Sequence, residues 1–228
     1  MSRYRHEYKY RINTVQKNIL EIKAAGLMMM DAHVGAEGAY YIRSLYFDDY
    51  ENSCYYENED GTDPRAKFRI RYYNRDTGFI KLEKKSKTRG MTLKESSRIT
   101  VGQCEEFMAG RIPGPESEKQ IRLFEEIRLR NLLPRVIVSY ERVPYIYPVG
   151  NVRVTFDDQI TASNEISGFL TGEYQKRPIL SLGESILEVK WDELLPPFIK
   201  ECMQLDNLQW STFSKYYLCR KYNANGGF

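Results

Sequence analysis

Several segments of the chain alternate charged and apolar residues with the period of a β-strand. Successive strand side chains point to opposite faces of a sheet, so each set of charged or polar residues lines one side. The faces predicted in this way comprise Arg5, Glu7, Lys9 and Arg11; Lys67, Arg69 and Arg71; Lys81, Glu83 and Lys85; Lys94, Ser96 and Arg98; Arg153, Thr155 and Asp157; and Glu188 and Lys190.

Positive charge is concentrated on these faces. They carry twelve Lys or Arg and four Asp or Glu, a net charge of +8, whereas the whole chain carries only +3. The remainder of the protein is therefore mildly acidic. A basic surface of this kind favours a polyanionic ligand. The alternative is an ordinary solvated sheet face, which usually mixes both signs of charge at near balance.

The same patterns predict the order of the secondary structure. Eight strands are expected over residues 3–12, 40–48, 66–73, 79–85, 92–99, 135–142, 151–158 and 185–191. Helices are expected over residues 14–25, 101–110, 117–131, 193–204 and 211–222, with a short helix or loop over 49–60. Loops are expected over residues 74–78, 86–90 and 168–183.

Helix caps and apolar stripes support these assignments. Asn13 or Thr14, Ser117 and Ser211 stand where N-caps are preferred. Two stripes, which we expect to face the core, have helical spacing: Val15, Ile19 and Ile22, and Ile121, Phe124 and Ile127.

Eight strands with one basic and one apolar face predict an α+β protein built on a closed antiparallel barrel with flanking helices. A barrel of about eight strands can enclose a small ligand. If the charged faces point inward, the helices must cover the apolar faces. We expect one domain over residues 1–228, with a disordered tail over 223–228. The alternative architecture places the charges outside and leaves their common sign unexplained.

Composition indicates a folded protein and bears on its cellular location. A hydrophobic fraction of 42 % and an aromatic fraction of 13 % are enough for a packed core. No apolar run approaches the roughly 20 residues that span a bilayer, and no apolar signal-peptide core is present, so we expect a cytoplasmic protein. The four cysteines show no close spacing and are expected to be free thiols. With two histidines, a His-based metal site or a catalytic triad has few candidates.

Eight short motifs in order resemble the VTC-type polyphosphate polymerase domain of the triphosphate tunnel metalloenzyme (CYTH-like) superfamily. The resemblance extends from about residue 3 to 220. The motifs are Glu7-Tyr8-Lys9-Tyr10, Tyr46-Phe47-Asp48-Asp49, Lys67-Phe68-Arg69-Ile70-Arg71-Tyr72, Leu82-Glu83-Lys84-Lys85, Tyr140-Glu141-Arg142, Arg153-Val154-Thr155-Phe156-Asp157, Leu187-Glu188-Val189-Lys190 and Phe213-Ser214-Lys215.

The resemblance implies an eight-stranded antiparallel tunnel whose basic interior holds ATP, triphosphate or polyphosphate. The phosphate ligands and catalytic residues that it implies are Lys9, Arg69, Arg71, Lys85, Lys94, Arg142, Arg153 and Lys215, with Lys190 and Ser214 as further phosphate contacts. Glu188 would hold Mn²⁺ or Mg²⁺, with Glu7 and Glu83 as secondary metal candidates. Arg142 and Lys215 rest chiefly on the resemblance, because strand alternation does not single them out.

The chain departs from the family in two ways. The superfamily's first strand alternates two glutamates and a lysine, but here Arg5 replaces one glutamate and only Glu7 and Lys9 remain. This departure favours the polymerase branch over hydrolytic members that use several carboxylates. The phosphate-sensing and membrane segments of the eukaryotic proteins are not seen, so a separate membrane or accessory protein is an expected partner.

Three functions remain open from the sequence. The first is a metal-dependent polymerase that transfers the γ-phosphate of ATP onto a polyphosphate chain. The second is an inorganic or nucleoside triphosphatase of the same superfamily. The third is a binding module without turnover. Nucleic acid is not an expected ligand, because the basic residues are predicted to face a closed interior and no aromatic stacking motif accompanies them.

Overall fold

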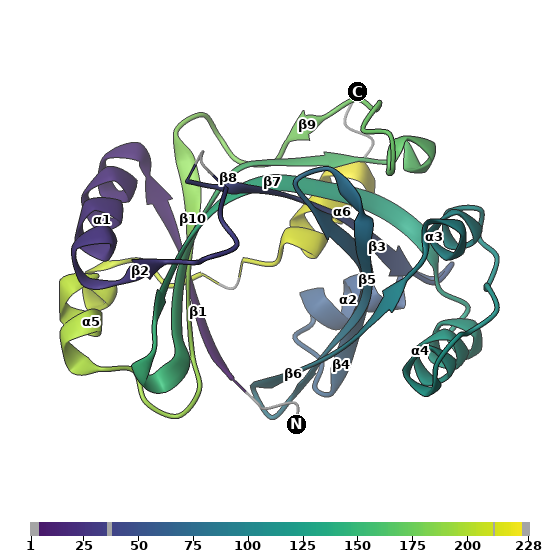
Figure 1. Ribbon diagram of the computed structural model, residues 1–228, viewed down its shortest axis with the longest axis horizontal. Coiled ribbons are helices and arrows are strands. Elements are labelled where there is room, and N and C mark those ends of the chain that lie inside the picture. Colours follow the sequence, from purple (N-terminus) through teal and green to yellow (C-terminus); the bar gives the residue numbers. More distant parts are fainter. Residues whose placement is uncertain (1–4, 36–37, 212, 225–228) are drawn as a thin grey trace.

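The charge-alternating segments form one antiparallel sheet that curls on itself (Figure 1). The computed structural model describes residues 5–35, 38–211 and 213–224. The main strands follow the order β1-β10-β8-β7-β3-β4-β5-β6. In chain order their bounds are β1 His6–Asn13, β3 Tyr40–Asp48, β4 Arg65–Tyr73, β5 Asp76–Thr88, β6 Met91–Ile99, β7 Leu133–Tyr147, β8 Val152–Ser163 and β10 Glu184–Trp191. The predicted eight-stranded antiparallel architecture is therefore confirmed.

The two edge strands of this sheet approach each other at one end. Arg5, just before β1, forms an antiparallel bridge with Thr92 on β6. Two short strands that the sequence did not predict extend the sheet: β2 (Met29–Met30) pairs with β7, and β9 (Arg177–Pro178) pairs with β8. The bridge brings the two edges together, so the sheet surrounds an interior.

Tight turns explain why two predicted loops are shorter than expected. Tyr73 pairs with Asp76, so Asn74 and Arg75 alone join β4 to β5, with φ angles of 52° and 61°. Positive φ at both central residues is the type I′ pattern, which matches the twist of a hairpin. The loop predicted over residues 86–90 is likewise mostly strand, because β5 runs to Thr88 and only residues 89–90 form the turn.

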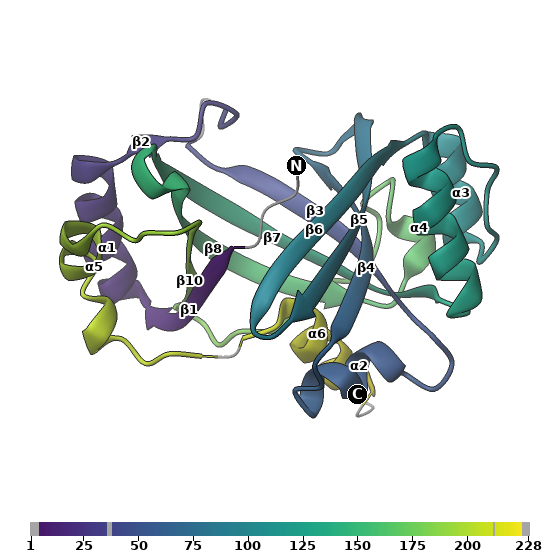
Figure 2. The ribbon, with the colours of Figure 1, turned by 90° about the horizontal axis from the view of Figure 1, so that it is seen from below.

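Six helices accompany the sheet: α1 and α5 lie on one side of it, α3 and α4 lie on the other side, and α2 and α6 pack together between these two groups, with α6 facing the interior (Figures 1 and 2). Their bounds are α1 Thr14–Leu27, α2 Ser53–Glu59, α3 Val101–Met108, α4 Glu118–Leu129, α5 Pro197–Cys202 and α6 Lys215–Ala224, and three short 3₁₀ turns cover Val149–Asn151, Ile166–Gly168 and Leu205–Asn207. No helix in the described ranges is long and apolar enough to cross a membrane.

Two apolar clusters pack the helices against the sheet. One joins β3, β4, β5 and β7 to α2, α3, α4 and α6, through side chains such as Phe68, Phe107 and Ile127. The other joins β1, β8 and β10 to α1 and α5, through side chains such as Val154 and Leu187. The apolar strand faces thus point outward beneath helices, as predicted, and the charged faces point into the interior.

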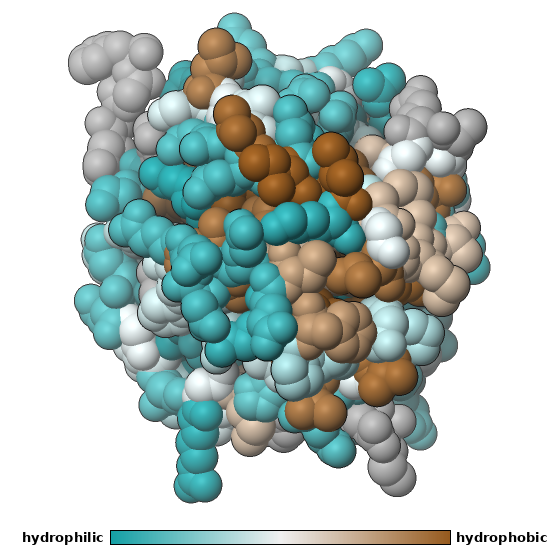
Figure 3. Space-filling view, turned by 90° about the vertical axis from the view of Figure 1, so that its left-hand side faces the viewer, coloured by the Kyte–Doolittle hydropathy of each residue, from teal (hydrophilic) through white to brown (hydrophobic). Residues whose placement is uncertain are grey.

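Helix α1 packs with a different face from the one predicted. Its N-cap is confirmed, because Asn13 and Gln16 form a reciprocal capping box. Its buried residues, however, are Leu20 and Ala24. The stripe predicted to face the core is exposed: Val15 by 67 %, Ile19 by 47 % and Ile22 by 75 %. Apolar side chains gather on the side of the molecule that carries α1 and α5 (Figure 3).

The other helix ends need smaller corrections. Ser117 caps α4 as predicted, but Ile121 of the α4 stripe is exposed while Leu123 is buried. The predicted helix over residues 193–204 begins only at Pro197.

The cap of α6 is Ser214 rather than Ser211. The Ser214 hydroxyl accepts a hydrogen bond from the Tyr217 amide at 3.3 Å. The Ser211 amide instead donates to the Lys9 carbonyl at 2.9 Å. In the predicted tail, residues 223–224 complete α6, and residues 225–228 lie outside the described part.

Candidate functional site

The curled sheet encloses a cavity of about 510 Å³, which we call the tunnel. Two carboxylates, Glu7 and Glu188, line it together with eleven cationic side chains. The eleven are Arg5, Lys9, Lys67, Arg69, Arg71, Lys85, Lys94, Arg142, Arg153, Lys190 and Lys215. Such an excess of positive charge in an enclosed space favours a ligand that carries several negative charges.

Nine of the twelve cations expected on the charged faces line this cavity. Arg11, Lys81 and Arg98 do not. Arg11 is exposed on β1 and lies 3.8 Å from Glu184, and the guanidinium of Arg98 donates to the Gly78 carbonyl at 2.7 Å. The charged faces therefore extend beyond the tunnel at the strand ends.

Arg69 and Arg71 on β4 lie on one wall of the tunnel. Arg71 is buried, and its guanidinium donates to two neutral hydroxyls, Ser44 Oγ at 2.9 Å and Tyr140 OH at 3.0 Å. Arg69 donates to Tyr46 OH at 2.9 Å and pairs with Glu83 at 2.6 Å. These hydroxyls therefore orient the Arg71 guanidinium without neutralising its charge. The charge remains available to an anion in the tunnel.

Glu83 does not fit the role of metal ligand that was expected for it. It is only 1 % exposed and does not line the tunnel. One of its oxygens pairs with Arg69 and the other with Lys94 at 2.8 Å. Burial alone would raise the pKa of Glu83, but Arg69, Arg71 and Lys94 outweigh it and lower the pKa. Glu83 thus orients two cations from behind the tunnel wall.

Glu7 and Glu188 lie in a checkerboard of charges on neighbouring strands. Glu7 pairs across the strands with Lys190, and Lys9 pairs with Glu188. The ammonium of Lys190 contacts both carboxylates, Glu188 Oε2 and, at 3.3 Å, Glu7 Oε1. Lys9 Nζ lies 3.8 Å from an oxygen of each carboxylate. Glu188 therefore forms a salt bridge with Lys190, and this pairing extends to Glu7.

The electrostatics of these carboxylates follow from their neighbours. Burial would raise the pKa of Glu188, but Lys190, Lys215, Lys9 and Arg142 lower it well below its usual value. Burial would likewise raise the pKa of Glu7, but Lys85, Lys9 and Lys190 outweigh it. Both groups are therefore ionised and can hold cations.

Asp157 on β8 joins Arg142 on β7 and Lys215 on α6. It is fully buried and accepts from Arg142 Nε at 2.5 Å and from the ammonium of Lys215. Arg142 and Lys215 also pair with Glu188, at 3.1 Å and 3.0 Å. Although Asp157 was predicted to share the charged face, its role as the buried counterion of both cations was missed. The resemblance-based placement of Arg142 and Lys215 in the tunnel agrees with the structure.

Arg153 does not pair with Asp157, the acidic residue on the same strand face. Its guanidinium pairs with Asp31, after β2, at 2.7 Å and also donates to Tyr40 OH at 2.5 Å. Asp31 lies 122 residues earlier in the chain, so sequence spacing gives no sign of this contact.

Lys67, Lys85 and Ser214 complete the tunnel beside α6. Lys67 Nζ donates to Asn58 Oδ1 at 2.5 Å and to Ser214 Oγ at 2.9 Å. Burial lowers the pKa of Lys67 well below its usual value, and the nearby charges of Lys9 and Lys85 lower it further. Lys67 is therefore a half-buried amine whose charged form an anion in the tunnel would stabilise.

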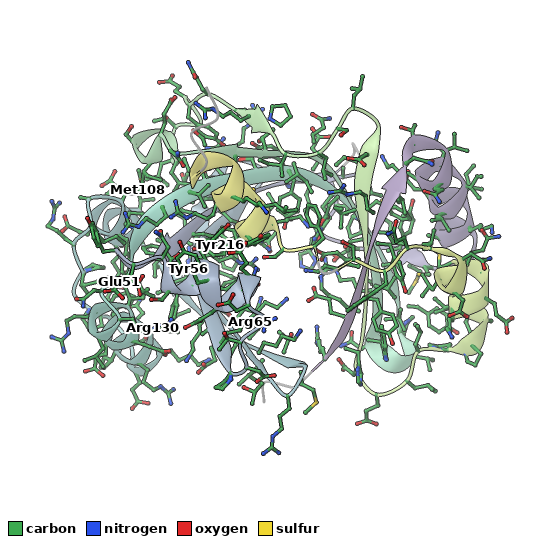
Figure 4. The ribbon with its side chains drawn as sticks, turned by 180° about the vertical axis from the view of Figure 1, so that it is seen from behind. Glu51, Tyr56, Arg65, Met108, Arg130 and Tyr216 are labelled. Atoms are coloured by element: carbon green, nitrogen blue, oxygen red, sulfur yellow. The ribbon has the colours of Figure 1, made fainter. Side chains whose placement is uncertain are left out.

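Tyrosine side chains form a second part of the site that charge alternation missed. Those lining the tunnel are Tyr40, Tyr46, Tyr73, Tyr140 and Tyr216. Figure 4 shows Tyr216 on α6, the helix that also supplies Lys215. Tyr46 and Tyr140 orient Arg69 and Arg71 through the hydrogen bonds given above. Hydroxyls at alternate positions of β3 are the signal that would have revealed Tyr40, Ser44 and Tyr46.

The protein's own groups supply only some of the ligands that a divalent metal needs at this site. Among the described residues, no three carboxylates, imidazoles or thiols gather as a metal site. Glu7 and Glu188 both contact one ammonium, so a single cation can reach the two carboxylates. Mg²⁺ commonly binds one or two carboxylates together with substrate phosphates. Glu188 and Glu7 thus fit a metal that a phosphate ligand also coordinates.

A curled antiparallel sheet with a cationic interior and a carboxylate pair defines the class of protein, a triphosphate-tunnel fold. The model of the VTC domain family matches residues 4–222, and the chain belongs to that family. This match confirms the resemblance that the sequence motifs indicated. A comparison with curated proteins finds no match.

Solved structures agree on the fold. A putative adenylyl cyclase from Hippeastrum, described as having a dominant triphosphatase activity, is 14 % identical with a TM-score of 0.54, covering 97 % of this chain and 96 % of its own. A putative adenylate cyclase from Bacillus halodurans is 13 % identical with a TM-score of 0.52, covering 90 % and 88 %. A Pyrococcus horikoshii protein is 14 % identical with a TM-score of 0.50, covering 96 % and 99 %. At these identities the likeness concerns the fold alone.

Proposed function

We propose that this protein is a metal-dependent polyphosphate polymerase that transfers the γ-phosphoryl group of ATP onto the end of a polyphosphate chain. The observation that carries the proposal is the tunnel wall, with eleven cations facing two carboxylates. The γ-phosphorus would leave the β–γ bridging oxygen and bond to a terminal oxygen of the acceptor, with ADP as the leaving group. Phosphoryl transfer needs positioning and charge stabilisation more than covalent help from the protein.

The residues divide this work by chemistry. Arg69 and Arg71 would grip non-bridging oxygens, because the planar guanidinium fork bonds bidentately to phosphate. Lys9, Lys85 and Lys94 would supply positive charge along the bound polyphosphate. The cations around α6 would hold further phosphate groups of the same polyphosphate. Mn²⁺ or Mg²⁺ bound by Glu188, with Glu7 beside it, would neutralise charge on the transferring phosphates.

The arrangement of the carboxylates favours transfer to phosphate over transfer to water. Each oxygen of Glu7 and of Glu188 lies within 4 Å of an ammonium or guanidinium nitrogen. Carboxylates held in this way are weak acceptors for the proton of an attacking water. A phosphate acceptor is already anionic and needs no such base. Arg5, in place of a further glutamate, also lines the tunnel and adds positive charge.

A triphosphatase is the second candidate. Hydrolysis would use the same cations and the same metal carboxylates, with water in place of the phosphate acceptor. The Hippeastrum structure named above, which has the same fold, is described as a triphosphatase.

Incubation with ATP and Mn²⁺, followed by separation of polyphosphate, phosphate and remaining ATP, tests the proposal. The polymerase predicts polymer that forms with ADP in proportion. Free phosphate formed without polymer would establish the triphosphatase instead. Unchanged ATP, with triphosphate still bound, would leave a binding module.

A further inference from the structure

Lys190 is the side chain that connects the two tunnel carboxylates. Its ammonium contacts Glu188 Oε2 and lies 3.3 Å from Glu7 Oε1. The three residues come from neighbouring positions on β1 and β10, with Glu7 directly opposite Lys190. The only contacts of the Lys190 side chain that the structure shows within the described ranges are with these two carboxylates.

A divalent cation bound to Glu7 and Glu188 needs the same oxygens. Metal–oxygen bonds of about 2.1 Å for Mg²⁺ leave no room for an ammonium between the two carboxylates. Resting on the metal-dependent function proposed above, we infer that Lys190 is an internal cation that competes with the metal for this carboxylate pair. The metal then binds only when Lys190 swings away.

Lys190 suits this role better than Lys9, the other lysine near both carboxylates. Lys9 Nζ lies 3.8 Å from each carboxylate and is anchored by a hydrogen bond to the Phe213 carbonyl at 3.1 Å. Lys190 makes the closer contacts with the two carboxylates, so its ammonium lies where the metal would bind. Among the described residues, no contact outside the carboxylate pair holds this ammonium in place.

A polyanion in the tunnel offers Lys190 another partner. Arg153 is its cross-strand neighbour on β8, and like charges directly opposite each other repel. A phosphate between Lys190 and Arg153 would relieve this repulsion and draw the ammonium from the carboxylates. Polyphosphate binding would then free the metal ligands, and by linkage the metal would favour polyphosphate binding.

Titration of the protein with Mn²⁺ alone tests the inference, with bound metal measured by electron paramagnetic resonance and without nucleotide or phosphate. Lys190→Met should bind Mn²⁺ at least about 10-fold more tightly than wild type, since the charge-assisted contacts of Lys190 with both ligands are removed. Lys67→Met is the matched control, because it removes the same charge from the same tunnel but contacts neither carboxylate. Its gain should stay below about 3-fold, the effect of a screened, more distant charge. Adding Glu188→Gln to Lys190→Met should abolish the gain.

Equal gains in Lys190→Met and Lys67→Met would overturn the inference, because the effect would then be general electrostatics. Weaker binding in Lys190→Met, or no Mn²⁺ binding in either wild type or variant, would also overturn it. Melting curves without metal establish that each variant is folded. If the gain is specific to Lys190 but ATP gives no polymer, the inference stands and the polymerase proposal fails.

Discussion

Lys85 on β5 pairs with Glu7 on β1 at a distance of 2.8 Å, where the two edges of the sheet meet. β1 and β5 are not neighbours in the sheet, because the edge strand β6 lies between them where the sheet closes. β6 is joined to the chain next to β1 by the bridge between Arg5 and Thr92. Side chains from separate walls therefore neutralise one another in the tunnel. A polyanion that enters must exchange these internal ion pairs for its own.

Lys67 should give triphosphate binding a distinctive pH dependence. Its pKa lies well below the usual 10.5, mainly because it is buried. As the pH rises through this lowered pKa the amine becomes neutral, so affinity for triphosphate should fall. Calorimetry over a pH series measures this, and Lys67→Met should lack this part of the dependence. An identical pH profile in Lys67→Met would refute the role of Lys67.

The same group should act on stability with the opposite sign. A lysine whose folded pKa is lowered destabilises the charged folded protein, fully so at pH below the lowered pKa. This penalty disappears as the pH rises from the lowered pKa towards 10.5. Without ligand, the free energy of unfolding of Lys67→Met should therefore exceed that of wild type near neutral pH, and the difference should shrink as the pH rises. Urea denaturation at several pH values measures it.

Asp157→Asn should be strongly destabilising. The substitution leaves Arg142 and Lys215 without their shared buried counterion, and breaking a buried pair on one side costs about 3–5 kcal/mol. Triphosphate should stabilise this variant more than wild type, because the two cations then share Glu188 as their remaining carboxylate partner. Asp31→Asn is the control, since its pair with Arg153 is partly exposed and is worth about 1 kcal/mol or less. Equal losses in free energy of unfolding would contradict the burial argument.

The exposed stripe of α1 makes a prediction about packing. Leu20→Ala should lower the free energy of unfolding by about 2–5 kcal/mol, because Leu20 is buried against the sheet. Ile22→Ala on the same helix should change it by about 0.5 kcal/mol or less, because Ile22 is exposed. Chemical denaturation measures both. A large loss of free energy of unfolding in Ile22→Ala alone would show that α1 packs with the Val15, Ile19 and Ile22 face, as the periodicity predicted.

The tunnel wall could be predicted where strand alternation is regular. Arg69 and Arg71 follow the two-residue period of β4, and this places both in the tunnel. On β7 a register shift between Ser139 and Glu141 interrupts the ladder, so alternation could not orient Arg142. Lys215 is the first residue of a helix, where the strand period has no meaning. Both were found only through the family motifs.

Long-range partners and helix faces are what the sequence could not supply. Asp31 reaches Arg153 from a loop, and no local pattern encodes that meeting. Helix α1 has apolar residues on two sides, and periodicity alone does not choose between Ile22 and Leu20. The choice follows from the sheet on which the helix packs. Tyr46 and Tyr140 were missed because charge was the only property used to follow the strand faces.

The affinity of Arg71→Met for triphosphate, measured by calorimetry without metal, tests the central claim most directly. Arg71 is buried in the tunnel and bonds to neutral hydroxyls, so its loss strands no carboxylate. Each charge-assisted bond is worth about 1.5–3 kcal/mol, so the dissociation constant should rise about 10- to 100-fold. Arg98→Met, which removes an arginine of the charged faces outside the tunnel, should bind nearly as wild type does. Wild-type affinity in Arg71→Met, or an equal loss in Arg98→Met, would contradict a tunnel that binds polyphosphate through its interior cations.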